Sequence, residues 1–151
     1  MSTHVYTSEL EWSGGTGQGY RAYGRSHTVG LGSAGSLTVS ADPAFRGDAA
    51  LPNPEQLLLA AASSCQMLSF LAVAALAHVD IVDYSDSAQA IMPADASPMR
   101  ITEITLHVSV VARGTDEWTV RELLEKAHDE CYIANTLATA VTVIADVEVV
   151  A

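Results

Sequence analysis

The feature that most constrains this chain is a stretch of 21 residues, 57–77, that carries no charge. The segment Asn53-Pro54-Glu55-Gln56 before it is typical of a helix start, because Asn53 can cap and Gln56 can reach back to the cap. We therefore predict a helix over residues 54–78. A helix that is apolar all round must be buried all round. A 151-residue protomer cannot easily surround it alone, so the sequence predicts an obligate homodimer.

The same stretch is long enough to cross a membrane, but its composition argues against that. Serine and glutamine residues interrupt its middle, and its near charged flanks are Glu55 and Asp80 rather than Lys or Arg. Residues 1–6 lack the basic and apolar regions of a signal peptide. We therefore expect a cytoplasmic protein with no membrane partner, whose cysteines are reduced at rest.

The charge balance narrows the choice of partners. The chain has seven basic and 18 acidic residues, which gives a net charge of −11 at pH 7. Binding to a phosphate backbone or to an anionic membrane needs clustered Lys and Arg. We therefore expect no nucleic-acid partner.

Hydrophobic periodicity predicts the order β-β-β-α-β-β-α-β in a single domain, 1–151. This order lacks regular βα alternation, so the fold class is α+β. The segment Thr119–Glu122 matches a capping box and predicts the start of the second helix. Strands are expected at 5–12, 20–29, 37–40, 81–92, 100–112 and 140–150, and the second helix at 119–137.

The two cysteines are the clearest candidates for chemistry. Cys65 lies within the predicted buried helix, and the spacing of Val120, Leu124 and Cys131 puts Cys131 on the apolar face of the second helix. Each alone could be a small core residue. If the two helices pack together, the pair becomes a dithiol that can cycle through a sulfenic acid to a disulfide. Adding His128 gives no standard metal spacing and no fourth ligand.

A reactive thiolate needs a nearby cation, and cations are scarce here. The candidates are Arg21 and Arg25 in the early strand and Arg46 before the first helix. Glu55 could hold an arginine by a bidentate ion pair, or simply complement the helix dipole. Ten residues of straight helix separate Glu55 from Cys65 by roughly 15 Å. A shared site therefore needs a long arginine, a bent helix or a partner subunit.

The segment from Asn53 to Cys65 resembles the signature of the OsmC/Ohr family, the osmotically induced and organic hydroperoxide resistance proteins. Both have an Asn-Pro-Glu start, a run of small residues and a cysteine ten residues after the glutamate. The element order also matches over essentially the whole chain. Tyr132 and Ala134 replace the proline and serine that follow the second family cysteine. The region around Arg21 and Arg25 also differs from the arginine turn of the hydroperoxide resistance branch, so this chain resembles a less characterised OsmC-like branch.

The resemblance implies an intertwined homodimer with long central helices and flanking antiparallel sheets. It also implies a thiol peroxidase without metal, haem or other cofactor. Carried over by motif, Cys65 attacks the peroxide, Cys131 resolves the sulfenic acid, and Glu55 holds the activating arginine, for which we favour Arg25 over Arg21. The reductant would be a dithiol, such as a lipoyl group on a carrier protein.

The organic part of a peroxide would favour an apolar lining, for which Met67 and Phe70 are candidates. Two alternatives remain open. The chain could be a non-catalytic dimer that binds an apolar ligand and has inert cysteines. It could also be a different thiol enzyme that uses the same pocket.

Overall fold

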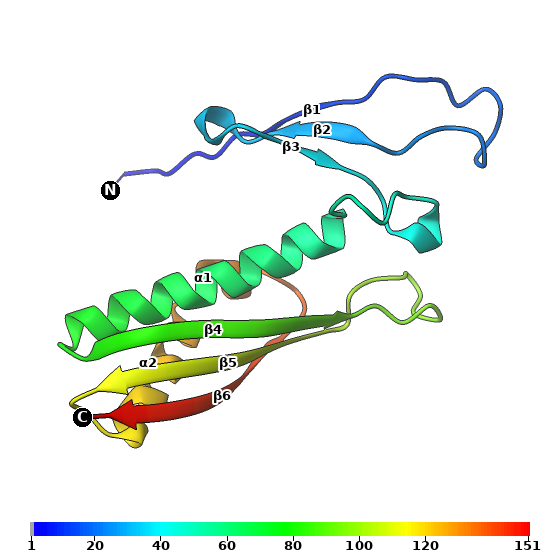
Figure 1. Ribbon diagram of the computed structural model, residues 1–151. Helices are drawn as coiled ribbons and strands as arrows, with labels where there is room; N and C mark the ends of the chain where they lie inside the picture. The colour runs from blue at the N-terminus through cyan, green and yellow to red at the C-terminus, as the bar shows by residue number, and fades with distance from the viewer. Residues whose placement is uncertain (1) are drawn as a thin grey trace. The chain divides into compact units, whose positions relative to one another are not determined.

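The computed structural model describes residues 2–151, which form two compact units that meet within the sequence at Leu57 and Leu58 (Figure 1). The first unit contains a small sheet, and the second contains a larger sheet with helices. The element order is β-β-β-α-β-β-α-α-β, which confirms the predicted α+β class. It differs from the expected order only in that the second helical region is broken in two.

The first unit holds a three-stranded antiparallel sheet of β1 (Glu9–Glu11), β2 (His27–Gly30) and β3 (Ser36–Val39), with two short 3₁₀ turns after β2 and β3. The predicted hairpin is confirmed, but its first two strands are shorter than expected. Residues 20–22 form a turn and residues 23–26 lie outside any strand. The backbone carbonyls of Tyr20, Tyr23 and Gly24 accept side-chain hydrogen bonds instead of pairing in a strand. Local side-chain contacts therefore replace the predicted strand here.

Helix α1 (Pro54–Leu76) begins as the sequence predicts. The backbone N–H of Gln56 donates to the Asn53 side chain at 2.9 Å, and the N–H of Asn53 donates to the Gln56 side chain at 3.1 Å. This reciprocal pair satisfies two backbone donors that the first turn leaves free. The helix ends two residues before the predicted limit, because His78 adopts a left-handed conformation with φ of 59°.

The second unit contains β4 (Asp80–Ile91), β5 (Glu103–Arg113), α2 (Glu117–Asp129), α3 (Tyr132–Thr136) and β6 (Val141–Val150). Strands β4 and β5 pair antiparallel, whereas β5 and β6 pair parallel. The expectation of purely antiparallel sheets is therefore wrong for this sheet. Parallel neighbours need a crossover connection, which α2 and α3 supply.

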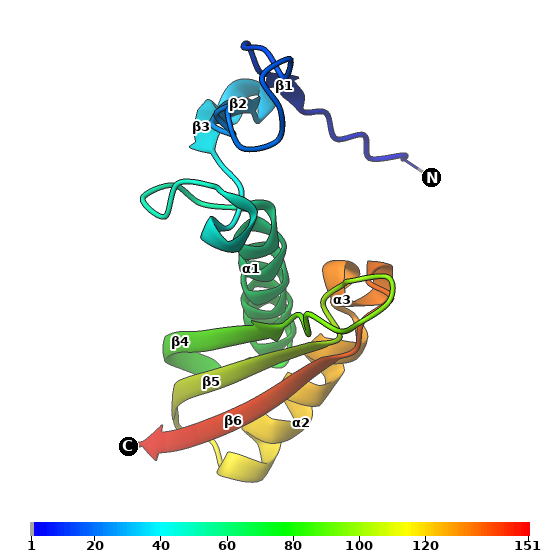
Figure 2. The same ribbon diagram turned by 90° about the vertical axis from the view of Figure 1, so that its right-hand side faces the viewer.

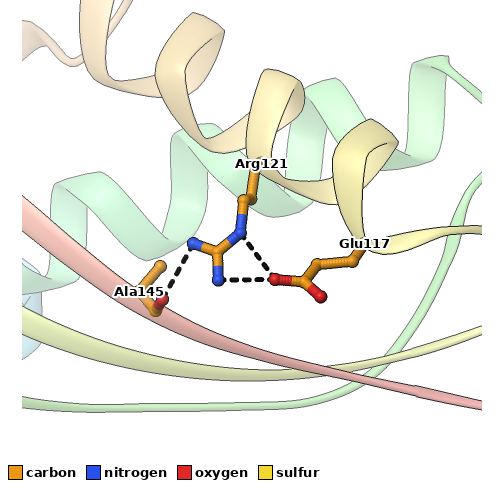
Figure 3. Close-up of polar contacts among 3 residues, drawn as sticks. All are labelled: Glu117, Arg121 and Ala145. Carbon is orange, nitrogen blue, oxygen red and sulfur yellow. Dashed lines mark hydrogen bonds and ion pairs between the residues drawn. The ribbon is translucent and has the colours of Figure 1, made fainter.

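The first turn of α2 also differs from the prediction. Asp116, not Thr119, caps the helix, and its carboxylate accepts the backbone N–H of Thr119 at 2.9 Å. This hydrogen bond lowers the pKa of Asp116. One turn later Arg121 donates to Glu117 and to the backbone carbonyl of Ala145 (Figure 3). Arg121 thereby ties α2 to the edge strand β6.

Helices α1 and α2 cover one face of the larger sheet (Figures 1 and 2). The alternation of residues 102–110 in the sequence predicts one buried face, and the buried positions of β5 alternate strictly. Thr102, which the alternation includes, lies before the strand and is exposed. The helices contribute Phe70, Val73, Val120 and Leu124 to the same core. The β5 members of this core are Ile104, Leu106, Val108, Val110 and Ala112.

Candidate active site

The structure brings the two cysteines together within the second unit. Cys65 lies on α1 and is half-buried, whereas Cys131 is 1% exposed. Cys131 is not on the apolar face of the second helix, where the spacing predicts it. It occupies the break between α2 and α3, with extended backbone angles, and caps α3. The break turns its side chain into the core while Cys65 keeps some access to solvent.

Burial is the main cause that raises the pKa of the Cys131 thiol. Cys65 raises the pKa of Cys131 further, which indicates that the two thiols lie close enough to interact. Hydrogen bonds from the backbone N–H groups of Ala134 and Ile133 lower the pKa of Cys131. Burial and an adjacent acid both disfavour the thiolate. Cys131 is therefore a protonated, shielded thiol beside the more accessible Cys65.

A polar cluster lies between α1 and β4. The Ser63 hydroxyl donates to the carboxylate of Asp86, with O–O distances of 2.6 and 2.8 Å to its two oxygens. Tyr84 is two residues before Asp86 on β4 and packs on Phe70, with ring centroids 5.8 Å apart. Its pKa is raised well above the usual range, first by burial and then by the charges of Asp86 and Cys131.

A cavity of about 290 Å³ lies at the polar cluster. Met67 lines it together with Ser63, Tyr84 and Asp86. Phe70 is 0% exposed and belongs to the core, so its predicted role as pocket lining is wrong. The cavity is thus more polar than the sequence suggested.

Two other buried polar groups lie on the facing helices. Gln66 is 1% exposed and its amide donates to the carbonyl of Leu124 at 3.5 Å. Within residues 2–151, the Gln66 side-chain oxygen and Nδ1 of His128 are buried without a hydrogen-bond partner. In that same part of the chain, no group of three or more His, Cys, Asp or Glu side chains could hold a metal ion.

The candidate arginines Arg21 and Arg25 lie in the first unit, and their side chains differ in burial and contacts. Arg21 is exposed, whereas Arg25 is half-buried. The Arg25 guanidinium donates to the carbonyls of Tyr20 and Tyr23, and its central carbon lies 4.6 and 3.9 Å from the centroids of their rings. Such cation–π contacts fix the side chain. The loop before β2 therefore singles out Arg25 as the organised cation.

Glu55 lies in the first turn of α1 and is half-buried. Among the residues that the structure describes, it forms no ion pair with Arg21 or Arg25. Its position complements the positive end of the helix dipole. The predicted pairing of Glu55 with an arginine stays a prediction. Arg46 is exposed and adopts a left-handed backbone conformation in the loop before α1.

Sequence reasoning missed Ser63, Tyr84 and Asp86. One signal was available, since Tyr84 and Asp86 are two apart on a predicted strand and must share its face. Which face that is depends on the irregularity between Ile81 and Asp83, where the register with β5 shifts. The sequence does not reveal such a bulge.

Comparison with known proteins gives the family. The sequence pattern of OsmC-like proteins matches residues 47–146. The chain belongs to the OsmC-like family. A search of curated proteins finds no significant match to this OsmC-like chain.

Solved structures agree with this assignment. An OsmC-like protein of unknown function from Vibrio cholerae is 26% identical, with a TM-score of 0.84, and the match covers 95% of this chain and 100% of that one. An organic hydroperoxide resistance protein from Elizabethkingia anophelis is 21% identical, with a TM-score of 0.69 and coverage of 99% and 100%. A Bacillus subtilis organic hydroperoxide resistance protein is 22% identical, with a TM-score of 0.61 and coverage of 95% and 98%. The last two establish similarity of fold.

Proposed function

We propose that this OsmC-like protein is a thiol-dependent peroxidase. The Cys65 thiolate attacks one oxygen of the peroxide, the O–O bond breaks, and the protonated alkoxide leaves as an alcohol. Cys65 is then a sulfenic acid. The Cys131 thiol attacks its sulfur, water leaves, and the two cysteines become a disulfide. A dithiol reductant then restores both thiols by exchange.

The observation that carries this proposal is the asymmetric pair of neighbouring thiols. Cys65 is accessible enough to meet a small peroxide, and Cys131 is shielded but adjacent. If both cysteines were only core residues, we would expect both to be buried. The arrangement suits an attacking thiol and a resolving thiol.

Activation of Cys65 needs a positive charge, and we propose Arg25 for that role. A guanidinium can stabilise both a thiolate and a departing alkoxide. Arg25 is the better ordered of the two candidates, because ring faces and loop carbonyls hold it. Glu55 would orient this arginine when the site is assembled.

The substrate class that we propose is organic hydroperoxides, with hydrogen peroxide as a weaker substrate. Met67 provides apolar contact in the cavity between α1 and β4. Two structural neighbours from Elizabethkingia anophelis and Bacillus subtilis are named organic hydroperoxide resistance proteins, which supports a role related to peroxides.

We propose that the working form is a homodimer. Helix α1 is long and apolar enough to cross a membrane by length and composition, yet only 28% of its most apolar window is buried within one chain. Leu68 is 60% exposed on it and Leu76 is 81% exposed. A soluble protein does not normally leave such a helix uncovered. A second copy in the cytoplasm would bury it without a lipid partner.

The test measures free thiols and intact mass of the reduced protein before and after one equivalent of cumene hydroperoxide. We expect both thiols to disappear and the mass to fall by the two hydrogens lost to an internal disulfide. Cys65→Ser should abolish peroxide consumption. Cys131→Ser should allow one turnover and then over-oxidation of Cys65 to the sulfinic acid.

The alternatives give different results in the same assay. Two unchanged thiols would contradict the peroxidase and favour a dimer that binds an apolar ligand. A reactive Cys65 that alkylates rapidly but consumes little peroxide would favour another thiol enzyme. Dithiothreitol and dihydrolipoamide, compared as reductants, test whether a dithiol of the lipoyl type is preferred.

A further inference from the structure

A further cavity, of about 420 Å³, lies within the first unit and is lined by neither cysteine. The side chains of Trp12, Tyr23, Ala41 and Pro54 make its walls mainly apolar. Arg25 also borders it and brings a positive charge to these walls. A largely apolar cavity with one or two polar groups is typical of sites for small molecules. The residues of this cavity therefore indicate which kind of ligand it can bind.

The aromatic walls of this cavity are held in place by contacts within the same loop. The indole N–H of Trp12 donates to the carbonyl of Gly24 at 2.9 Å. The rings of Trp12 and Tyr23 meet edge to face, with centroids 6.1 Å apart. The backbone at Gly14 packs closely on the indole, since an added Cβ there would lie 2.8 Å from Cζ2 of Trp12. A ligand that enters this cavity therefore does not have to order its aromatic walls first.

The positive charge of Arg25 has no matching negative charge in the part of the chain that the structure describes. Within residues 2–151, the two ion pairs involve Arg113 and Arg121, and no carboxylate pairs with Arg25. Its guanidinium donates instead to two carbonyl oxygens and stacks on two tyrosine rings. A guanidinium has five N–H donors, so three remain free. A carboxylate binds such donors more strongly than a neutral acceptor does.

We propose that this cavity is a binding site for a small aromatic carboxylate. The carboxylate binds the free donors of Arg25, and the ring packs against the rings of Trp12 and Tyr23. An aliphatic acid of equal charge lacks the contact between rings, and an aromatic alcohol lacks the charge. The inference goes beyond the proposed peroxidase function and does not depend on either cysteine.

The charge of the whole chain makes this binding easy to tell from unspecific attraction. The net charge is −11 at pH 7, so the surface as a whole repels anions. A carboxylate that binds must therefore use a local positive charge. Arg21 belongs to the same loop but is exposed and does not line the cavity, so it serves as the matched control.

The experiment titrates the reduced full-length protein with three probes in a calorimeter: benzoate, cyclohexanecarboxylate and benzyl alcohol. We expect benzoate to bind about 10-fold more tightly than benzyl alcohol, because a hydrogen bond to a charged group is stronger than a neutral one. It should bind about fivefold more tightly than cyclohexanecarboxylate, which cannot pack ring against ring. Absence of binding at millimolar benzoate would overturn the inference. Equal affinity for benzoate and either of the other probes would overturn it as well.

Variants of the walls locate the binding. Arg25→Gln should weaken benzoate binding by about 10-fold or more and leave benzyl alcohol binding unchanged, which also shows that the loop still folds. Arg21→Gln should bind benzoate as wild type does. Trp12→Leu should weaken benzoate binding by about fivefold, whereas Trp118→Leu, at an exposed position on α2, should not. Equal benzoate affinity in Arg25→Gln and wild type would overturn the inference, and the three probes on the wild-type protein decide the matter if Arg25→Gln loses both ligands.

The same ligand separates this site from the proposed function. Because we also propose Arg25 as the activating cation, saturating benzoate should slow the consumption of cumene hydroperoxide. Binding of benzoate without such slowing would support the site and contradict the proposed role of Arg25. A protein that binds benzoate but consumes no peroxide would likewise support the site and contradict the peroxidase.

Discussion

At the scale of single residues, Arg25 shows how a loop can organise a charged side chain before any substrate arrives. Two carbonyl oxygens and two aromatic rings of the same loop hold its guanidinium. It also borders a cavity of about 420 Å³ whose other walls include Trp12 and His27. Arg21, four residues earlier, is exposed. The two arginines offer a matched comparison, because replacing either one removes one positive charge from the same loop.

We predict that Arg25→Gln slows the reaction of Cys65 with cumene hydroperoxide by about 10²-fold, because one preorganised electrostatic donor is typically worth that much. Arg21→Gln should change the rate less than threefold, a size typical of a distant surface charge. Single-turnover kinetics with excess peroxide measure both rates. A larger loss in Arg21→Gln than in Arg25→Gln would reverse our assignment of the activating arginine.

A second prediction at this scale concerns the protonation of Cys131. Burial and Cys65 raise its pKa, so its midpoint in the reduced protein should lie above the ordinary value of 9.0. Because the folded-state pKa is the higher one, the contribution of this thiol to stability is present below pH 9.0 and is lost as the pH rises through the folded-state pKa. The chemical shift of ¹³C-labelled cysteine Cβ reports the midpoint without requiring access by a reagent.

The variant Cys65→Ser provides the internal control for that titration. It removes the contribution of Cys65 and leaves the other causes in place, so the midpoint of Cys131 should fall. An unchanged midpoint would mean that the two thiols do not interact.

At the scale of elements, the contact between α1 and β4 brings the site together. Ser63 from the helix and Asp86 from the strand form a short hydrogen bond beside the cavity. The contact joins residues 23 positions apart in the sequence. It thereby fixes the register of the helix against the strand.

We predict that Ser63→Ala lowers the free energy of unfolding by about 1–2 kcal/mol, because it removes a half-buried hydrogen bond to a charged acceptor. Ser64→Ala, at an exposed neighbouring position on the same helix, should change it by less than about 0.5 kcal/mol. Urea unfolding of the reduced proteins measures both. Equal effects in the two variants would mean that the hydrogen bond contributes nothing measurable.

At the scale of the whole molecule, a single chain leaves apolar side chains of α1 exposed to solvent. Leu68, Leu71 and Leu76 are all exposed, although the remaining face of the helix packs in the core. Burying one leucine fully is worth roughly 1.5–3 kcal/mol. Covering several of them would supply enough free energy to favour a dimer.

We predict that the wild-type protein sediments at twice the chain mass of 15.9 kDa. Leu68→Glu should shift it toward the monomer at micromolar concentration, because a buried carboxylate without a partner is costly. Trp118→Glu, the same kind of change at an exposed position on α2, should stay dimeric. A wild-type monomer at all concentrations would contradict the homodimer proposal, and a dimeric Leu68→Glu protein would place the interface elsewhere.

Local patterns predicted well where one segment determines its own structure. The Asn53–Gln56 box forms as expected, and the alternation in β5 buries the expected face. Prediction failed where two local solutions compete. Both Asp116 and Thr119 could cap α2, and the hydrogen bond from Thr119 to Asp116 decides between them. In the same way, the pattern at 20–26 predicts a strand, but hydrogen bonds from Arg25 stabilise a different conformation.

The sequence by itself determined the family, the α+β class, the long apolar helix and the two cysteines worth testing, because these depend on composition, periodicity and short motifs. Only the tertiary structure decided that β6 runs parallel to β5, that Cys131 lies in a break between two helices, and that Asp86 accepts a hydrogen bond from Ser63. These features depend on contacts between segments far apart in the chain. Burial, charge and hydrogen bonding at the site come from those contacts, and no single stretch of sequence contains them.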